Sequence, residues 1–301
     1  MTSATKIRSS CLEATLSPEH GGLVERLVWA APNGKTFDLL HRPAELEPSR
    51  AAPNRFGLWA MVPFANRAVG GVVDDGVRRF TVPLNDEVAN INIHGFGWQS
   101  AWSYRSDRAG HTVLSHTRDD GPDPYRYRCD LDINLDEAGM TAKLSVTNTA
   151  ETALPFGLGL HPWFPCAADT RLTLAAEGAL VLGQHYRANG HETFDDGGPY
   201  ARGPVFRSHT EQVLSCLGWD GRALIDTPST GLRLTLTASE SLRFPLVWAP
   251  PNADFLCVEP QSHGMGSPSE AAARAVSPLK TLAPGETLSG WLRIEPSLLV
   301  G

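Results

Sequence analysis

Short runs in which apolar and polar residues alternate, separated by glycine and proline, most constrain the fold of this chain. Residues 131–135, 140–147 and 232–237 each place an apolar side chain at every second position. A period of two is typical of antiparallel strands that bury one face. The 28 glycines and 23 prolines recur throughout and leave little room for a long helix. We therefore predict an all-β fold, a large antiparallel β-sandwich with few short helices.

The sequence contains one clear helix start and no obvious domain boundary. Ser267-Pro268-Ser269-Glu270 has the order of a capping box with proline at the first helical position, and an alanine-rich segment follows. This predicts a short helix at the surface. All-β folds of 301 residues are often one domain, and no repeat, low-complexity tract or Ser/Gly linker divides the chain. We expect a single domain over residues 1–301.

Charge and composition restrict the partners and the compartment. The net charge is −7, whereas nucleic acid and anionic membranes bind basic faces, so neither is expected as a partner. Residues 1–8 do not resemble a signal peptide, and no apolar run approaches the roughly 20 residues that span a bilayer. Five scattered cysteines favour reduced thiols over disulfides or a zinc site. We expect a cytoplasmic protein, either a monomer or a homodimer.

Three stretches each place one proton-transfer group beside glycine, proline or aromatic residues at the end of a predicted strand. His94 precedes a Gly-Phe-Gly-Trp turn, and His161 precedes a proline that ends or kinks its strand. Glu259 ends the apolar run 255–258. Because the environment can move the pKa of imidazole and carboxyl groups toward neutral pH, the three residues are candidate general acids and bases.

Each candidate also has an ordinary structural interpretation. His94 could cap a strand end, although the glycines that flank Phe96 would let the backbone approach a ligand closely. His161 could be a core histidine bound to backbone carbonyls. Glu259 could be a structural carboxylate bound to an arginine, since a carboxylate after a buried run is costly unless it is paired or used. Trp163 could belong to the core or offer a flat face to the C–H groups of a sugar.

A cationic side chain lies near a second pair of glycines. Arg67 follows the apolar run 61–65 and precedes Gly70 and Gly71, which suggests a turn that faces a ligand. Its guanidinium could hold two sugar hydroxyls or a carboxylate. The local sequence alone favours an ordinary surface ion pair.

Taken together, these motifs resemble the aldose 1-epimerases, the galactose mutarotase-like proteins. The resemblance covers nearly the whole chain in the order of the family, and the ordered set is more specific than any single motif. The motifs are Leu16-Ser17-Pro18-Glu19-His20-Gly21-Gly22, Pro63-Phe64-Ala65-Asn66-Arg67, Ile93-His94-Gly95, Trp102, Asn148, residues 157–164, Gly218-Trp219-Asp220-Gly221 and Val258-Glu259-Pro260-Gln261-Ser262-His263.

The resemblance implies a galactose mutarotase-like supersandwich with a sugar cleft on one sheet. It also implies an isomerase that interconverts the α and β anomers of a hexose or hexose derivative, with neither a metal nor a redox cofactor. Glu259 matches the general base at the anomeric hydroxyl, and His161 matches the general acid at the ring oxygen. His94 matches a histidine that holds and polarises the sugar, and Arg67 matches an arginine that contacts sugar hydroxyls.

One position departs from the family pattern. The family usually carries an aspartate shortly before the Gly-Trp-Asp-Gly segment that begins at Gly218, and it binds hydroxyls far from the anomeric carbon. Residues 212–217 contain no acid here. Asp220 or another acid could substitute for this aspartate, and we predict Asp220 as a substrate-binding residue. We also predict Asn66 and Trp163 as substrate-binding residues. The departure leaves the identity of the sugar open.

Three alternatives remain. The substrate could be a phosphorylated or sulfonated sugar, which needs extra cations such as Arg187, Arg202 or Arg207. The chain could be a non-catalytic carbohydrate-binding protein on the same fold. The two histidines and Glu259 could form the facial triad of a metal-dependent enzyme, although they lack the close sequence pairing that usually marks such sites.

Overall fold

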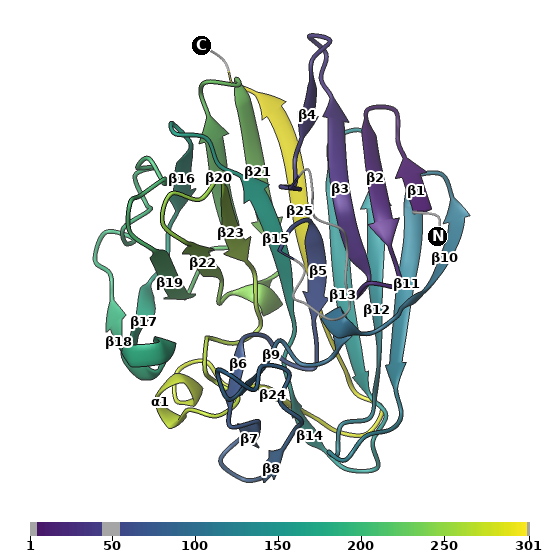
Figure 1. Ribbon diagram of the computed structural model, residues 1–301, viewed down its shortest axis with the longest axis vertical. Helices are drawn as coiled ribbons and strands as arrows, with labels where there is room; N and C mark the ends of the chain where they lie inside the picture. Colours follow the sequence, from purple (N-terminus) through teal and green to yellow (C-terminus); the bar gives the residue numbers. More distant parts are fainter. Residues whose placement is uncertain (1–4, 44–54, 300–301) are drawn as a thin grey trace.

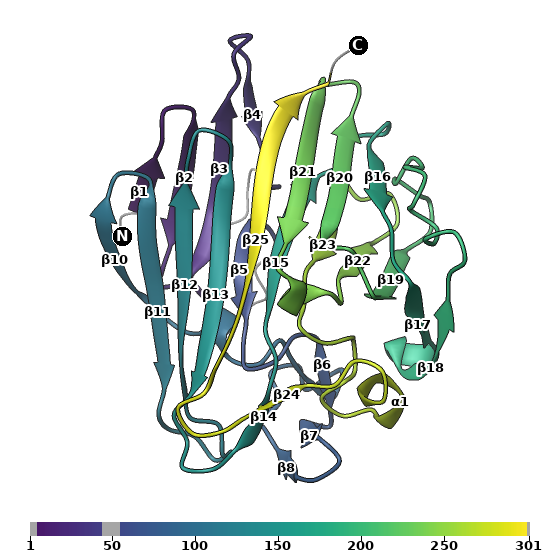
Figure 2. The same ribbon diagram turned by 180° about the vertical axis from the view of Figure 1, so that it is seen from behind.

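Two large antiparallel sheets face each other in the computed structural model, which describes residues 5–43 and 55–299 (Figure 1). The first sheet is nearer the viewer in Figure 1, and the second is nearer in the reversed view of Figure 2. The prediction of a large antiparallel β-sandwich is confirmed.

The first sheet contains eleven of the described strands, and the strands of the cavity described below lie in its middle. Their order is β1-β2-β3-β5-β15-β23-β22-β19-β17-β18, and β4 pairs with β3 at the side. Their bounds are β1 (Thr5–Arg8), β2 (Leu12–Ser17), β3 (Leu23–Ala30), β4 (Thr36–Asp38), β5 (Leu58–Met61), β15 (Gly159–Pro165), β23 (Phe255–Glu259), β22 (Leu246–Ala249), β19 (Gln212–Leu217), β17 (Gly178–Leu182) and β18 (Ala188–Thr193).

The second sheet contains eight of the described strands, with longer and more regular pairing. Their order is β10-β11-β12-β13-β25-β21-β20-β16. Their bounds are β10 (Ser103–Arg108), β11 (His111–Arg118), β12 (Tyr127–Leu135), β13 (Met140–Asn148), β25 (Thr287–Leu298), β21 (Leu232–Ala238), β20 (Arg222–Thr227) and β16 (Arg171–Leu174).

The small strand pairs and α1 gather at one end of the sandwich (Figures 1 and 2). None of the helices in the described part of the chain is long and apolar enough to cross a bilayer. The remaining elements are the pairs β14 (Leu154–Phe156) with β24 (Lys280–Leu282), β6 (Arg67–Val69) with β9 (Ile91–Ile93) and β7 (Val72–Asp74) with β8 (Arg79–Thr81), the 3₁₀ turns η1 (Gly97–Gln99), η2 (Gln184–Tyr186) and η3 (Glu240–Leu242), and α1 (Ala271–Arg274).

The core forms between the sheets, because alternation directs one face of each strand inward. Leu16 and Leu27 of the first sheet belong to the same buried cluster as Leu131, Leu144 and Leu292 of the second. The three period-two runs lie within β12, β13 and β21, as predicted. The alternation therefore identifies strands of the second sheet directly from the sequence.

The strands that carry the candidate site are buried on both faces. In β15, Leu160 and Phe164 join the core between the sheets, whereas His161 and Trp163 face the other way, into a cavity. The same alternation in β23 places Glu259 on the cavity face. Because both faces are covered, these strands are nearly continuous apolar runs rather than alternating ones.

The predicted capping box over residues 267–270 is wrong. The helix α1 is a single turn that begins at Ala271, and no side chain caps its N-terminus. The Glu270 carboxylate instead contacts the Arg187 guanidinium and accepts a hydrogen bond from the Ala188 N–H. Glu270 therefore binds an arginine from another element instead of the backbone N–H group that it would bind in a capping box.

Candidate active site

A cavity of about 460 Å³ lies on the face of the first sheet that turns away from the core. The strands β5, β15, β23, β22 and β19 each contribute side chains to its lining. Six of the seven predicted site residues meet there: Asn66, Arg67, His94, His161, Trp163 and Glu259.

Asp220 is the predicted site residue that the structure leaves outside the cavity lining. It is exposed in the turn before β20, where its carboxylate accepts a hydrogen bond from the Arg222 N–H at 2.9 Å. Its role there is to brace a turn. In this structure its carboxylate is therefore not among the groups that face the cavity.

His161 and Glu259 face each other on neighbouring strands. Trp163 pairs with Cys257 in the antiparallel ladder of β15 and β23, so His161 is brought opposite Glu259 two residues further on. The His161 Nε2 atom lies 3.3 Å from the Glu259 Oε1 atom. The residues are only 5% and 1% exposed, so their mutual contact takes place almost out of water.

Glu259 is a buried carboxyl group with few permanent donors. Its Oε2 atom accepts a hydrogen bond from the Gln261 amide at 3.1 Å. Burial raises its pKa to about 8, against the opposing effects of the Arg67 charge and the Gln261 hydrogen bond. The described residues include no arginine in an ion pair with Glu259. Glu259 is therefore not a structural carboxylate held by an arginine among these residues.

The His161 ring is held between two indoles. Its centroid lies 4.3 Å from that of Trp59 and 5.3 Å from that of Trp163, with interplanar angles of 26° and 12°. Burial lowers the pKa of His161 to about 3. Within residues 5–43 and 55–299, its Nδ1 atom has no hydrogen-bond partner. In this pair, burial favours the protonated Glu259 carboxyl and the neutral His161 imidazole, so the two groups share one proton near neutral pH.

His94 is a neutral imidazole whose Nε2 atom forms no hydrogen bond within the described part of the chain. Its Nδ1 atom accepts a hydrogen bond from the Asn66 N–H at 3.1 Å, which places the ring proton on Nε2. Burial and the nearby charges of His161 and Arg67 lower its pKa well below the usual value. The ring also meets His161 edge to face at 5.4 Å. His94 can therefore donate a hydrogen bond but carries no charge near neutral pH.

Gly95 has a backbone role next to His94. Its φ angle is +66°, and a Cβ atom there would lie 2.2 Å from the Val62 carbonyl oxygen. Only glycine fits such a close approach in the left-handed region. The sequence suggested an approach to a ligand at this turn, whereas the structure shows an approach to another backbone segment.

Asn66 reaches Glu259 through a chain of amides. Its side-chain nitrogen donates a hydrogen bond to the Gln261 Oε1 atom at 2.6 Å, and Gln261 in turn donates to Glu259. Asn66 and Gln261 are buried, at 2% and 0% exposure. The asparagine that the sequence predicted to bind substrate thus orients the candidate base through Gln261.

Arg67 places a cation at the cavity without a carboxylate partner among the described residues. Its guanidinium lies over the Tyr186 ring at 4.6 Å from the centroid, and its Nη1 atom contacts the Met265 sulfur at 3.6 Å. Burial lowers the pKa of Arg67 despite its neighbouring acids. The surface ion pair that local sequence favoured is not formed, and the guanidinium is available to a ligand.

Sequence reasoning missed two aromatic residues of the site. Trp59 faces His161 directly in the ladder of β5 and β15, and Tyr186 lines the cavity from η2. Trp59 lies in a short apolar run that resembles any buried strand, so only its pairing with β15 reveals its role. Tyr186 has a φ angle of +59°, which no sequence signal announces.

The arginines considered for an anionic substrate point elsewhere. Arg187 contacts Glu270, Arg202 lies 3.8 Å from the Asp196 carboxylate, and Arg207 donates to a backbone carbonyl. None of these three arginines is part of the cavity lining. These three arginines therefore do not supply the extra cations that a phosphorylated or sulfonated sugar would need.

The facial triad of the metal alternative is not assembled. Among the described residues, the potential ligand atoms that lie within 4.8 Å of one another belong to His161, Cys257 and Glu259, and His94 is outside this group. Burial raises the pKa of the Cys257 thiol well above its usual value, whereas metal binding needs a thiolate. This donor set does not resemble a catalytic metal site.

Comparisons with known proteins identify the fold and the family of the chain. The uncharacterized protein YphB of Escherichia coli K12 is 28% identical over 249 residues, which cover 78% of this chain and 82% of that protein. A crystal structure of an Escherichia coli K12 protein described as a candidate aldose 1-epimerase superimposes with a TM-score of 0.83 at 24% identity, covering 99% of both chains. A galactose mutarotase-like protein of Clostridium acetobutylicum gives a TM-score of 0.81 at 23% identity, covering 98% of this chain and 95% of that one. A sequence model of the aldose 1-epimerase family matches residues 7–295, and the chain belongs to this family.

Proposed function

We propose that this protein is an aldose 1-epimerase, which interconverts the α and β anomers of an aldose by general acid and base catalysis. The observation that carries the proposal is the buried contact of 3.3 Å between His161 and Glu259 in the cavity. The cavity volume of about 460 Å³ lies within the usual range for small-molecule sites. Membership of the aldose 1-epimerase family supports the same reaction.

The proton count of the pair suits ring opening. The step removes a proton from the anomeric hydroxyl and delivers one to the ring oxygen. The pair contains one proton in either of two forms, a Glu259 carboxylate beside a His161 imidazolium or a Glu259 carboxylic acid beside a neutral His161 imidazole. Ring opening of a bound sugar converts the first form into the second, and ring closure converts it back. Each positioned transfer typically contributes roughly 10²–10⁴ in rate.

The rest of the cycle follows from the symmetry of the reaction. The open aldehyde rotates about its C1–C2 bond, and the ring closes on the other face with the two proton transfers reversed. The Nε2–H of His94 and the guanidinium of Arg67 supply donors that hold sugar oxygens during this rotation. The indoles of Trp59 and Trp163 fix the His161 ring, which preserves its alignment with Glu259.

The test is anomer-exchange NMR over a panel of free sugars, with wild-type protein and Glu259→Gln. We expect acceleration by the wild type and a loss of at least about 10²-fold in the variant. Asp136→Asn, which alters a carboxylate outside the cavity, is the matched control and should keep full activity.

Two outcomes would overturn the proposal. Near wild-type exchange with Glu259→Gln would remove the proposed base. Saturable sugar binding without acceleration of any anomer exchange would instead favour a non-catalytic carbohydrate-binding protein.

A further inference from the structure

The two ends of the cavity differ in chemistry. Glu259 faces Leu246 of β22 in the ladder, and Trp248 on the same strand faces Val213 of β19. The strand β19 lies two positions from β23, which is about 10 Å at the usual strand spacing. Leu246, Trp248 and Val213 all line the cavity, so its floor changes from ionisable to apolar across those two strands.

The polar atoms of Trp248 and Tyr186 already have partners, whereas the Nε1–H of Trp163, whose ring centroid lies 5.8 Å from that of Trp248, has none among the described residues. The Trp248 Nε1–H donates a hydrogen bond to the Glu211 carboxylate at 3.0 Å, and the Tyr186 hydroxyl donates to it at 2.7 Å. Glu211 is not itself part of the lining. Trp248 therefore meets a ligand with the carbon surface of its ring, whereas the Tyr186 ring lies under the Arg67 guanidinium, 4.6 Å from its centroid. We call Val213, Leu246 and Trp248 the apolar wall.

A sugar hydroxyl group that packs against the apolar wall loses its hydrogen bonds to water and finds no hydrogen-bond partner there. Leaving a buried polar group without a partner costs about 1–3 kcal/mol, whereas a methyl group or a hydrogen atom at the same place loses nothing and gains contact. A site of this kind discriminates between two sugars that differ by one hydroxyl by roughly 10–100-fold.

We propose that the substrate is a deoxyaldose, a sugar whose edge remote from the anomeric carbon carries hydrogen or methyl in place of a hydroxyl at C4 or C6. The proposal rests on the proposed function and on one orientation of the sugar, with its anomeric centre at Glu259 and His161 and its remote edge toward β22 and β19. The apolar wall then covers that edge, while the donors of His94 and Arg67 serve the hydroxyls nearer the reacting carbon.

The experiment compares kcat/KM for anomer exchange between matched sugars. The pairs are 6-deoxyglucose with glucose, 6-deoxygalactose with galactose, and 4-deoxyglucose with glucose. We expect at least one remote deoxy sugar to be preferred about 10-fold or more. The control is 2-deoxyglucose, which lacks a hydroxyl beside the anomeric carbon and should not be preferred. Equal or better turnover of both parent hexoses would overturn the proposal.

A variant tests whether the apolar wall causes the preference. Val213→Thr replaces a methyl group by a hydroxyl at nearly constant shape, and it should reduce the preference for the deoxy sugar several-fold. Val181→Thr makes the same change on β17 at a valine that is 41% exposed, and it should leave the preference unchanged. An unchanged preference in folded Val213→Thr would contradict the assignment.

The failure of this inference is distinguishable from the failure of the proposed function. If the wild type accelerates hexoses but shows no preference for deoxy sugars, the function stands and the substrate class is wrong. If no sugar of the panel is accelerated, the proposed function itself fails. Calorimetric binding to the Glu259→Gln variant then reports the preference for a deoxy sugar independently of turnover, and equal affinity within each pair would end the inference.

Discussion

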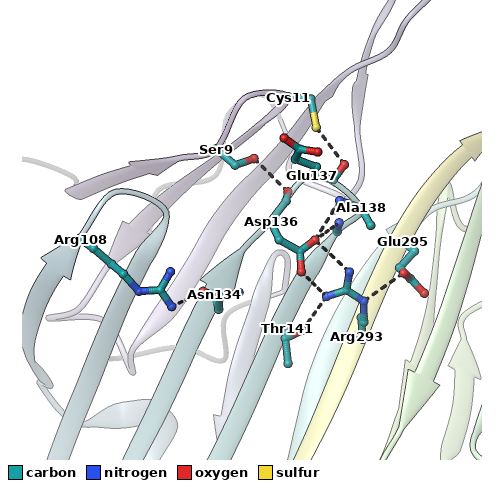
Figure 3. Close-up of polar contacts among 11 residues, drawn as sticks. Ser9, Cys11, Arg108, Asn134, Asp136, Glu137, Ala138, Thr141, Arg293 and Glu295 are labelled. Atoms are coloured by element: carbon teal, nitrogen blue, oxygen red, sulfur yellow. Dashed lines mark hydrogen bonds and ion pairs between the residues drawn. The ribbon is translucent and has the colours of Figure 1, made fainter.

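Two carboxylates in different parts of the molecule show how a structural acid differs from one available for chemistry. Asp136 lies in the turn between β12 and β13, where the Arg293 guanidinium donates to both of its oxygens at 2.9 Å (Figure 3). The N–H groups of Ala138 and Gly139 donate to the same carboxylate. Glu259 in the cavity has one amide donor and a neighbouring imidazole.

The two environments move the pKa in opposite directions. The hydrogen bonds from Arg293, supported by backbone donors, lower the pKa of Asp136 to about 2. Burial raises that of Glu259 to about 8. A carboxylate with permanent donors stays ionised and holds a turn, whereas a buried carboxyl with few donors can exchange its proton with a substrate.

The largest expected effect concerns the partner of Glu259. His161→Phe keeps a flat ring between Trp59 and Trp163 but removes the second proton-transfer group. We expect the exchange rate of the preferred sugar to fall by roughly 10²–10⁴, with the thermal unfolding transition retained. A loss of less than tenfold in anomer-exchange NMR would show that Glu259 works without this imidazole.

The pH dependence of the reaction follows from the shared proton. The pair shares one proton near neutral pH, so kcat/KM should be level in that range. Above pH 8 it should fall by about tenfold per pH unit as Glu259 loses that proton. The measurement is polarimetry after subtraction of the uncatalysed rate, and a kcat/KM that rises through pH 8 would contradict the proton count.

Stability should respond to pH with opposite signs at the two carboxylates. The folded Glu259 keeps its proton up to about pH 8, whereas the unfolded residue releases it above the ordinary value of 4.5, so rising pH favours unfolding over that interval. Glu259→Gln removes this dependence. We expect its melting temperature at pH 9 to exceed that of the wild type by a few degrees, on the order of 2 °C or more per kcal/mol. A lower melting temperature in the variant at pH 9 would indicate that the ionised carboxylate stabilises the fold.

The smallest expected effect is that of the structural carboxylate. Its lowered pKa means that its contribution is present above the ordinary value of 3.8 and is lost as the pH falls toward 2. Because Asp136 is 45% exposed at its side chain, Asp136→Asn should cost only about 1 kcal/mol in urea unfolding at pH 7. Its activity should match the wild type, and a drop in exchange rate would link this turn to the cavity.

Much of the fold could be predicted from local patterns. The alternation in β12, β13 and β21 is visible because these strands bury one face, and the sandwich follows from such runs. The register between strands could not be predicted, since no local signal states which runs pair. The capping box failed for a related reason, because Glu270 is taken by Arg187 from a distant segment.

For the candidate site too, local sequence identifies some residues, whereas others are recognised only once the strand pairing is known. His94, His161 and Glu259 stand out because each interrupts a strand-like run beside glycine or proline, and the family resemblance gives them roles. Their convergence depends on the pairing of β15 with β23, which sequence alone did not provide. Trp59 and Gln261 escaped notice for this reason, since each acts only through a residue that lies beside it in the folded chain.

The central claim is that Glu259 holds a transferable proton near neutral pH, and a carbon-13 NMR titration of its carboxyl group tests this most directly. Glu259→Gln identifies the resonance by its disappearance. The account predicts a midpoint near pH 8, shared with the alkaline fall in kcat/KM. A midpoint near the ordinary value of 4.5 would contradict it, because Glu259 would then be a solvated carboxylate with no proton to exchange.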